Sequence, residues 1–294
     1  MKTQNVSGEM QVYANSNLVS RLVSEVPNNK NWLGQLCRKG WAWEFLRRNP
    51  HYKTDFQTGL ADVFAATRWG LNHFCDPKES ALSANVFWRH EDCPEVLPLT
   101  ISKETFAMRI PLSLEGLSCH ISHIFDPRAN RHDLLFREEG RSLQLAVFGD
   151  GDLKGAGLVV AALDNPADIN ARTAALHRLN DLLFTKKMRA SLYPPEARAM
   201  RLTAVLTALD GWLARMSQRE IAYTMFNKNR VDREWNDPRE NLRDQVRRAV
   251  GCGQELMNGG YRQFLCRALA RRQTNEHRKA EAHVDKNMSL TVIG

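Results

Sequence analysis

Short apolar or alternating runs fill residues 85–163 and are separated by turn-rich pieces such as DPRANRH (126–132). Apolar runs bounded by turn residues are typical of β-strands. The sequence therefore predicts a small antiparallel sheet, built from LSCHISHIF (117–125), DLLFRE (133–138), LQLAVFG (143–149) and GLVVAAL (157–163). GDGDLKGAG (149–157) lacks the Gly-Lys-Ser/Thr of a phosphate loop, and we predict it to be the hairpin turn between the last two runs.

From Asn165 onward the apolar residues recur three or four positions apart, which is the spacing of one helical face. One such stripe comprises Ile169, Leu176, Leu179 and Leu183, and a second comprises Leu202, Val205, Leu206, Leu209 and Leu213. YPPEA (193–197) separates the two stripes and marks a natural domain boundary.

The N-terminal part has a different character. Residues 1–28 are rich in Asn, Ser and Val without sustained periodicity, whereas WAWEFLRRNPHYKTDFQ (41–57) predicts a packed helix that stops at Asn49-Pro50. We expect an α+β fold, with N-terminal helices and a small antiparallel sheet followed by an all-α variant helix-turn-helix domain. The expected parts are a flexible arm (1–28), a regulatory and oligomerisation domain (29–185), a helix-turn-helix domain (186–272) and a flexible tail (273–294).

Complete helix-start chemistry occurs in MSQREIAYTMF (216–226). Ser217 can cap the first amides while Glu220, three residues later, reaches back to the backbone of Ser217, and Met216 can pack on Ile221. The sequence predicts a short helix here whose inner face is Ile221, Ala222, Met225 and Phe226.

A second helix is predicted in DPRENLRDQVRRAV (237–250), where Asp237 is the cap and Pro238 the first helical residue. Leu242, Val246, Ala249 and Val250 form its inner stripe. Beside that stripe lies a row of arginines four positions apart: Arg239, Arg243 and Arg247, with Asn241 and Arg248 farther round.

Two short helices in series, the second basic, form the layout of a helix-turn-helix protein, in which the second helix enters the major groove of DNA. We therefore expect the helix at about 238–250 to be the recognition helix and the helix at 217–226 to support it. The link between them, NKNRVDREWN (227–236), exceeds the usual three or four residues, so we expect a variant of the motif.

The distribution of charge supports contact with a polyanion. Residues 1–185 carry 20 Lys and Arg against 21 Asp and Glu, a net charge of −1, whereas residues 186–294 carry 21 against 12, a net charge of +9. A basic excess confined to one region is expected where that region meets nucleic acid, although a solvated basic tail is the alternative.

Arginine suits this role because its planar guanidinium can bind a phosphate, or the O6/N7 edge of guanine, with two hydrogen bonds. Asn241 and Gln245 could read adenine, with Asn241 better placed by its helical phase. Lys228, Arg230, Arg233 and Arg262 are expected to contact phosphates. The competing interpretation of the 237–250 helix is a set of surface ion pairs, between Glu240 and Arg243 and between Asp244 and Arg247 or Arg248.

Other functional classes find little support in the sequence. Six cysteines are scattered without a paired spacing, and His73, Cys75, His90, Cys93, Cys119, His120 and His123 do not form a zinc pattern, so no metal or cofactor is expected. No catalytic motif is present, and we expect no enzyme. Because no run is long enough for a membrane span and the N-terminus lacks a signal-peptide core, we expect a cytoplasmic protein.

Several of these segments carry a family resemblance. GWAWEFLRRNPHYK (40–53) resembles the N-terminal signature of the proteobacterial RovC and FseA group of transcriptional regulators, and the segments from RLTAVLTALDGWLARMSQREIAYTMF (201–226) through LRDQVRRAV (242–250) to GGYRQFL (259–265) resemble its C-terminal domain. The resemblance covers roughly residues 40–55 and 185–270, and is weaker in the predicted sheet.

The resemblance implies a DNA-binding activator of type VI secretion genes or of the excision and transfer of integrative conjugative elements. It implies a homo-oligomer, with a hexamer as one option, and contact with RNA polymerase as a further option. On the matching helices, the resemblance implies that DNA is read by Arg239, Arg243, Arg247 and Arg248. It places Ser217, Arg219 and Glu220 on the helix that supports the reading helix. We count Arg219 among the DNA contacts. Two alternatives stay open: an antiactivator that binds a related regulator protein instead of DNA, and an accessory factor for recombination.

Overall fold

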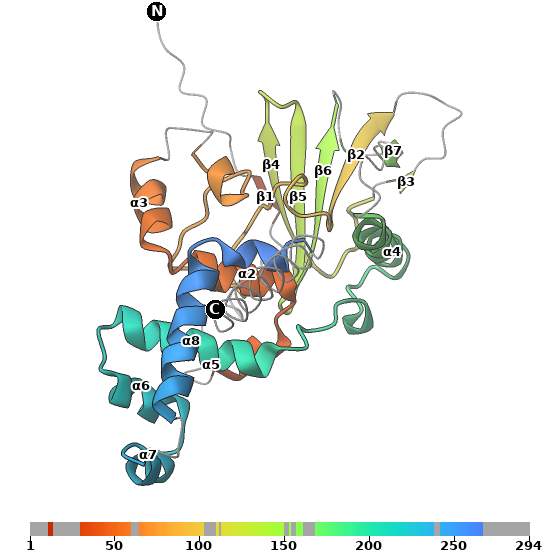
Figure 1. The fold of residues 1–294 in the computed structure, drawn as a ribbon. Coiled ribbons are helices and arrows are strands. Elements are labelled where there is room, and N and C mark those ends of the chain that lie inside the picture. The colour runs from red at the N-terminus through yellow and green to blue at the C-terminus, as the bar shows by residue number, and fades with distance from the viewer. Residues whose placement is uncertain are drawn as a thin grey trace, which may run out of the picture.

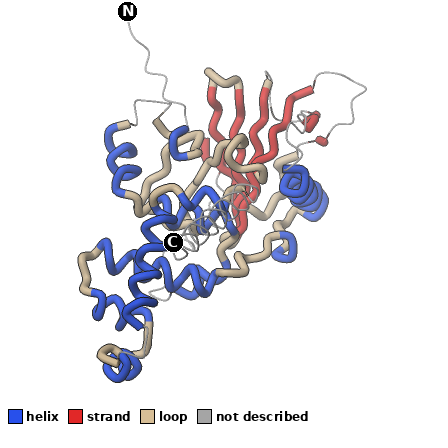
Figure 2. Tube along the Cα trace, in the orientation of Figure 1, coloured by secondary structure: helices blue, strands red, loops and turns tan. Residues whose placement is uncertain are grey.

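The computed structural model describes residues 11–13, 30–59, 65–102, 110–111, 113–149, 153, 157–160, 168–237 and 242–266. A twisted sheet occupies one end of the molecule and a group of helices extends away from it at the other, with α7 farthest from the sheet (Figure 1). Figure 2 shows the same division, with the strands gathered in the upper part, most helices below, and α3 and α4 on either side of the sheet. The expected α+β class, with a helical C-terminal region, is confirmed.

The sheet has seven strands in the order β1-β4-β5-β6-β2-β7-β3. The strands are β1 (Gln11–Tyr13), β2 (Val96–Ser102), β3 (Ile110–Pro111), β4 (His120–Asp126), β5 (Arg131–Glu138), β6 (Arg141–Phe148) and β7 (Gly157–Val160). β1 lies within the stretch expected to be a flexible arm, and β2 was not among the predicted runs. The rest of residues 1–28 and all of 273–294 lie outside the described residues.

Two expectations about the sheet are wrong. β2 and β6 run parallel, with Val96 opposite Gln144, so the sheet is mixed and not antiparallel throughout. β6 and β7 are not neighbours, because β2 lies between them, so residues 149–157 do not form a hairpin turn between paired strands. Both errors have one cause. β2 precedes β4 in the sequence, yet in the sheet it lies between β6 and β7.

One face of the sheet is apolar and is covered by α4 (Ile169–Thr185). Strand side chains alternate between the two faces, so residues two apart share a face. Leu134 and Phe136 in β5 and Leu145 and Val147 in β6 all join a buried cluster with Leu179 of α4. Ala175 and Leu182 of α4 belong to the same cluster, whereas Ile169 at the start of the predicted stripe is exposed.

The opposite face carries buried polar side chains from β4, β5 and β6, among them Ser122, Asp133 and Gln144. These three side chains each bond to the segment between residues 72 and 88. The Ser122 hydroxyl donates to Asn85, and the Gln144 amide bonds to both the N–H and the carbonyl of Trp88. Buried polar groups are stabilising only when they find partners, so these bonds fix this segment on the sheet.

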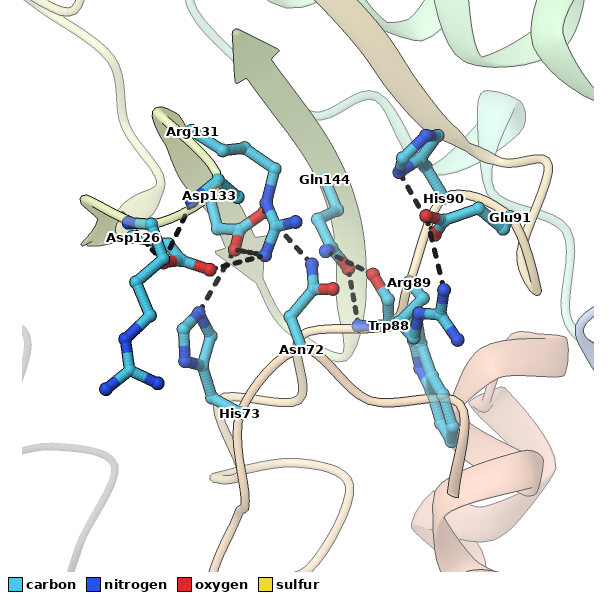
Figure 3. A network of polar contacts seen from close by, with 12 residues as sticks. Asn72, His73, Trp88, Arg89, His90, Glu91, Asp126, Arg131, Asp133 and Gln144 are labelled. Carbon is cyan, nitrogen blue, oxygen red and sulfur yellow. Dashed lines mark hydrogen bonds and ion pairs between the residues drawn. The ribbon is translucent and has the colours of Figure 1, made fainter. Parts of the chain in front are cut away.

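Asp133 is the centre of a network of polar contacts (Figure 3). Its carboxylate accepts from Asn72 Nδ2 at 3.1 Å, from His73 Nε2 at 3.1 Å and from two nitrogens of Arg131 at 3.0 Å each. Arg131 also lies 3.5 Å from the carboxylate of Asp126. A buried carboxylate with this many donors is fully satisfied, so we interpret the network as structural.

The N-terminal helices pack beside the C-terminal ones. They are η1 (Lys30–Gln35), α2 (Arg38–Leu46), α3 (Pro50–Thr58) and η2 (Thr67–Trp69). The predicted stop at Asn49-Pro50 is confirmed: α2 ends at Leu46, and the Asn49 side chain caps α3 by accepting from the N–H groups of His51 and Tyr52. Pro50 is the first residue of α3, where its missing N–H costs nothing.

The C-terminal region contains η4 (Ala190–Leu192), α5 (Ala199–Leu213), α6 (Gln218–Met225), α7 (Lys228–Glu234), α8 (Leu242–Met257) and η5 (Gly260–Phe264). α5 follows the second predicted stripe, with Leu202, Val205, Leu206 and Leu209 buried. α8 continues seven residues beyond the predicted end at Val250. No helix in the described ranges is long and apolar enough to cross a membrane.

A single apolar cluster joins the N-terminal helices to the C-terminal ones. It contains Trp41, Phe45 and Tyr52 from the first group, and Leu206, Leu209, Met257, Tyr261 and Phe264 from the second. Phe45 stacks on Phe264 with ring centroids 6.1 Å apart, and Trp88 lies 6.3 Å from Tyr261. Two segments that are far apart in the sequence therefore share one core.

Candidate nucleic-acid interface

α6 begins with the capping box that the sequence predicts. The Ser217 hydroxyl accepts from the N–H of Glu220 at 3.3 Å, and the Glu220 carboxylate accepts from the N–H of Ser217 at 2.7 Å. The backbone hydrogen bond from Ser217 lowers the pKa of Glu220 below its ordinary value. Both bonds satisfy amides that a helix N-terminus leaves without a partner in the helix, so the position of α6 is set by local sequence.

Only Phe226 and Asn227 separate α6 from α7. Asn227 caps α7, because its side chain accepts from the N–H of Asn229 at 2.9 Å. The segment that the sequence analysis treated as one long link therefore contains a helix of its own. α6, the two-residue turn and α7 form a compact pair of helices in series, with spacing much closer to a usual helix-turn-helix.

An apolar cluster holds α6, α7 and α8 together against α5. Its buried members are Ala208, Ile221, Ala222, Val231, Leu242 and Val246. Gly211 of α5 makes this packing possible: a Cβ placed there would lie 2.8 Å from Cγ1 of Ile221. A glycine at such a position lets two helices approach closely, and α6 is thereby seated on α5.

α8 is fixed on α5 by a similar close approach near its middle. A Cβ at Gly253 would lie 2.9 Å from Cβ of Leu209 and 3.3 Å from the carbonyl oxygen of Val205. The predicted inner residues Leu242 and Val246 are buried, and Ala249 and Val250 are partly buried. The inner face of α8 thus belongs to the core, and its first half presents Arg243, Arg247 and Arg248 to solvent.

Three arginines around α6, α7 and α8 lie over aromatic rings. The guanidinium of Arg219 is 5.7 Å from the ring of Tyr223, that of Arg230 is 5.1 Å from Phe226, and that of Arg243 is 5.3 Å from Trp235. Arg243 also donates to the carbonyl of Trp235 and to the side chain of Asn236. Stacked arginines keep their charge and lose part of their rotational freedom.

Acidic side chains pair with several of these cations. Arg230 and Arg233 lie 2.7 and 3.1 Å from the carboxylate of Glu234, and Arg247 lies 3.0 Å from Asp244. Of the predicted surface pairs, Asp244 with Arg247 is therefore present, and Glu240 lies outside the described residues. Because the side chains of Arg233 and Arg247 are 75% and 71% exposed, such pairs are weak and can exchange for other anions.

The predicted contact residues do not all come together. Arg219, Lys228, Arg230, Arg243, Arg247 and Arg248 lie on α6, α7 and the first half of α8. Arg262 lies beyond the other end of α8, a helix of 16 residues and hence about 24 Å. There it stacks on Tyr261 and donates to the carbonyl of Arg68. Arg239 and Asn241 lie outside the described residues.

Two exposed polar residues of α7, Asn229 and Asp232, were not among the predicted contacts. Asn229 lies on the side of α7 away from the buried Val231, whereas Asp232 bonds to Tyr223 and Arg219 of α6. The sequence signal for α7 is the cap at Asn227 followed by Val231 and Trp235 four positions apart, which is short enough to be taken for a link. Within the described part of the chain, no group of three His, Cys, Asp or Glu side chains is placed to hold a metal ion.

Comparison with known families agrees with this geometry. Residues 162–266 match the RovC family described as the DNA-binding domain of a transcription factor of the type VI secretion system. Residues 26–73 match the proteobacterial transcriptional regulator-like domain. No curated protein and no solved structure is significantly similar to the chain. With both matches in this order, the chain is a RovC-like transcriptional regulator with a C-terminal DNA-binding domain.

Proposed function

We propose that this regulator is a sequence-specific transcriptional activator that places α7 in the major groove of DNA. The observation that carries the proposal is the two-residue turn between α6 and α7. In a helix-turn-helix protein the helix after the short turn reads the bases. Asn229 and Arg233 of α7 are exposed on the side opposite the buried Val231, and Lys228 is exposed at the start of the helix.

This proposal moves the reading role from α8, where the sequence placed it, to α7. α8 packs along α5 through Val246 and Gly253 and forms part of the scaffold. Its exposed Arg243, Arg247 and Arg248 are suited to the phosphates that flank the groove. Phosphate contacts fix the register of a protein on DNA, whereas contacts with base edges supply the sequence preference.

Asn229 and Arg233 have the chemistry for reading bases. An asparagine amide can pair with N6 and N7 of adenine, and a guanidinium with O6 and N7 of guanine. The guanidinium of Arg233 is 75% exposed, so it can exchange its pair with Glu234 for a base edge. The cations around this surface belong to the part of the chain with a net charge of +9, which favours the approach of a polyanion.

We further propose that the regulator acts as a homo-oligomer on repeated half-sites, and that the targets are type VI secretion or mobile-element transfer genes. The match to a DNA-binding family of the type VI secretion system supports the first target class. Contact with RNA polymerase would follow from the activator role.

Two matched double variants separate the reading helix from the flanking helix. Asn229→Ala with Arg233→Ala removes two side chains from α7, and Arg247→Ala with Arg248→Ala removes two from α8. Binding is measured by fluorescence anisotropy on a duplex that the unmodified protein selects from a random-sequence library, and on a scrambled duplex of equal composition.

The α7 variant should bind both duplexes with similar affinity, because it has lost the base contacts. The α8 variant should keep its preference but lose affinity for both, and its slope of log K against log salt should be shallower by about 1.8, since each phosphate contact contributes about 0.9. Loss of preference in the α8 variant alone would return the reading role to α8. Failure of the unmodified protein to prefer any duplex would favour an antiactivator that binds a protein.

A further inference from the structure

Asp232 of α7 connects the two helices of the motif on their exposed side. One oxygen of its carboxylate, Oδ1, accepts from the hydroxyl of Tyr223 at 2.5 Å and lies 3.2 Å from Nη2 of Arg219. Both partners belong to α6, and Arg219 also lies over the ring of Tyr223. The three side chains thus form a unit, the Arg219–Tyr223–Asp232 cluster.

The cluster lies on the opposite side of the helix pair from the apolar contact between α6 and α7. Ile221 and Ala222 of α6 and Val231 of α7 are buried, whereas the side chains of Arg219 and Asp232 are 48% and 45% exposed. α6 has eight residues and α7 has seven, and helices this short are not stable alone. The angle between them therefore depends on contacts on both sides, and Asp232 supplies the exposed one.

The cluster changes the role expected of Arg219. Arg219 is a DNA contact in the sequence prediction, but in the structure its guanidinium is directed to a carboxylate of the neighbouring helix. The hydrogen bond from Tyr223, together with Arg219 and Lys228, holds the pKa of Asp232 below its ordinary value although burial acts in the opposite direction. Asp232 is therefore ionised at neutral pH and adds a negative charge to a surface that is otherwise rich in cations.

A fixed negative charge on a DNA-binding surface penalises binding in most registers. It repels phosphates in every complex in which the groove is not aligned with α7, and it keeps Arg219 from forming an additional phosphate contact. Specificity is a difference between two affinities, and it increases when the unwanted complex is made less stable. In the correct register a carboxylate can also accept a hydrogen bond from N4 of cytosine.

We propose that Asp232 is a specificity-determining residue of the DNA-binding surface, which lowers affinity for non-cognate DNA more than affinity for the cognate site. This inference rests on the proposed function, because it requires that the protein bind DNA with a sequence preference. It assigns to Tyr223 and Arg219 the task of holding the carboxylate in place, and makes them positioning residues.

Asp232→Asn tests the proposal, because the amide keeps the size of the side chain and removes its charge. The full-length variant is compared with the unmodified protein on the library-selected duplex and on the scrambled duplex. Release of Arg219 adds one phosphate contact to non-cognate binding, so affinity for the scrambled duplex should rise about eight-fold at 0.1 M salt, from a slope of about 0.9 per contact. Affinity for the selected duplex should rise less or fall, so the ratio of the two affinities falls.

Asp244→Asn in α8 is the matched control. Asp244 is 51% exposed and lies 3.0 Å from Nη2 of Arg247, one turn away in the same helix. The substitution removes one negative charge, as Asp232→Asn does, but at the flank of the surface. The affinities for the selected and the scrambled duplex should therefore rise together, and their ratio should stay constant. Tyr223→Phe removes only the hydroxyl that holds Asp232, and should lower the ratio in the same direction as Asp232→Asn.

The result that overturns the proposal is an unchanged ratio in Asp232→Asn and Tyr223→Phe while the unmodified protein prefers the selected duplex. In that case the proposed function stands and only the role of Asp232 fails. If the unmodified protein itself shows no preference, both proposals fail together, so the two failures are distinguishable within the same set of titrations.

Discussion

Arg48, just after α2, and Asp210 of α5 form a two-point ion pair although 162 residues separate them in the sequence. Nε of Arg48 lies 2.5 Å from Oδ1 of Asp210, and Nη2 lies 3.2 Å from Oδ2. Arg48 also donates to Glu44, whose fully buried carboxylate accepts further bonds from Arg47 and from the N–H of Ala81. The N-terminal helices are thus bonded to the helix that seats the DNA-binding motif.

Arg48→Ala should destabilise the protein by about 3 kcal/mol, because it removes the guanidinium that pairs both with Asp210 and with the fully buried carboxylate of Glu44. Glu44 keeps Arg47, which limits the loss. Arg201→Ala, on the exposed side of α5, is the control and should change stability by less than about 0.5 kcal/mol. Urea unfolding of both variants measures the difference. Equal midpoints would show that the pair between Arg48 and Asp210 does not hold the two segments together.

A fragment of residues 186–266 should not fold cooperatively, although it contains most of the matched DNA-binding domain. Without the N-terminal helices, α5 and the end of α8 would expose Leu206, Leu209 and Met257, which now share one buried cluster with Trp41 and Phe45. Burial of a large apolar side chain contributes about 1.5 to 3 kcal/mol. Circular dichroism during heating compares the fragment with the full chain. A sharp transition in the fragment would contradict the shared core and support a domain boundary near residue 186.

Two glycines of α8 should respond to alanine in opposite ways. A Cβ at Gly251 would have nothing within 4 Å, so Gly251→Ala should stabilise the protein by about 0.5 to 1 kcal/mol through helix propensity. A Cβ at Gly253 would lie 2.9 Å from Leu209, so Gly253→Ala should force α8 away from α5 and cost about 1 to 3 kcal/mol. Thermal unfolding of the pair gives the comparison. Stabilisation by both would mean that α8 does not pack closely on α5.

Stability should fall in acid partly because of Glu95. Burial alone raises the pKa of the Glu95 carboxyl, but Lys39 and Arg178 outweigh this effect and leave the pKa below its ordinary value. Nζ of Lys39 lies 3.9 Å from the carboxylate, and Nη1 of Arg178 lies 2.7 Å from it. A lowered folded-state pKa stabilises the fold fully above the unfolded-state value, about 4.3, and the contribution is lost as pH falls through the folded-state pKa.

The free energy of unfolding of Glu95→Gln, measured in urea between pH 7 and pH 3, should therefore lie below that of the unmodified protein at neutral pH and approach it in acid. A difference that stays constant over this range would show that the charge of Glu95 does not contribute to stability.

Features set by neighbouring residues could be predicted from the sequence. The capping box of Ser217 and Glu220 and the stop at Asn49-Pro50 are local, and both are confirmed. α7 was missed although it too has a local cap, at Asn227. Its seven residues carry too few apolar positions to show a helical period, and α6 ends only two residues earlier. The reading role was consequently placed on α8, whose amphipathic pattern is longer.

Long-range pairing could not be predicted in the same way. Nothing near Val96–Ser102 indicates that β2 pairs in parallel with β6, a strand more than 40 residues later, so the sheet was expected to be antiparallel. The bonds of Asp133 with Asn72 and of Arg48 with Asp210 join residues about 60 and 160 positions apart. Such contacts depend on the complete fold and leave no local pattern in the sequence.

The salt dependence of binding to selected DNA tests the central claim most directly. The affinity of the full-length protein for its library-selected duplex and for the scrambled duplex is measured by fluorescence anisotropy between 50 and 300 mM salt, a range chosen about the physiological value. With about five to eight phosphate contacts, the slope of log K against log salt should lie between roughly −4.5 and −7, with a clear preference for the selected duplex at every concentration. A shallow slope with equal affinity for the two duplexes would contradict the assignment of α6, α7 and α8 as a sequence-reading surface.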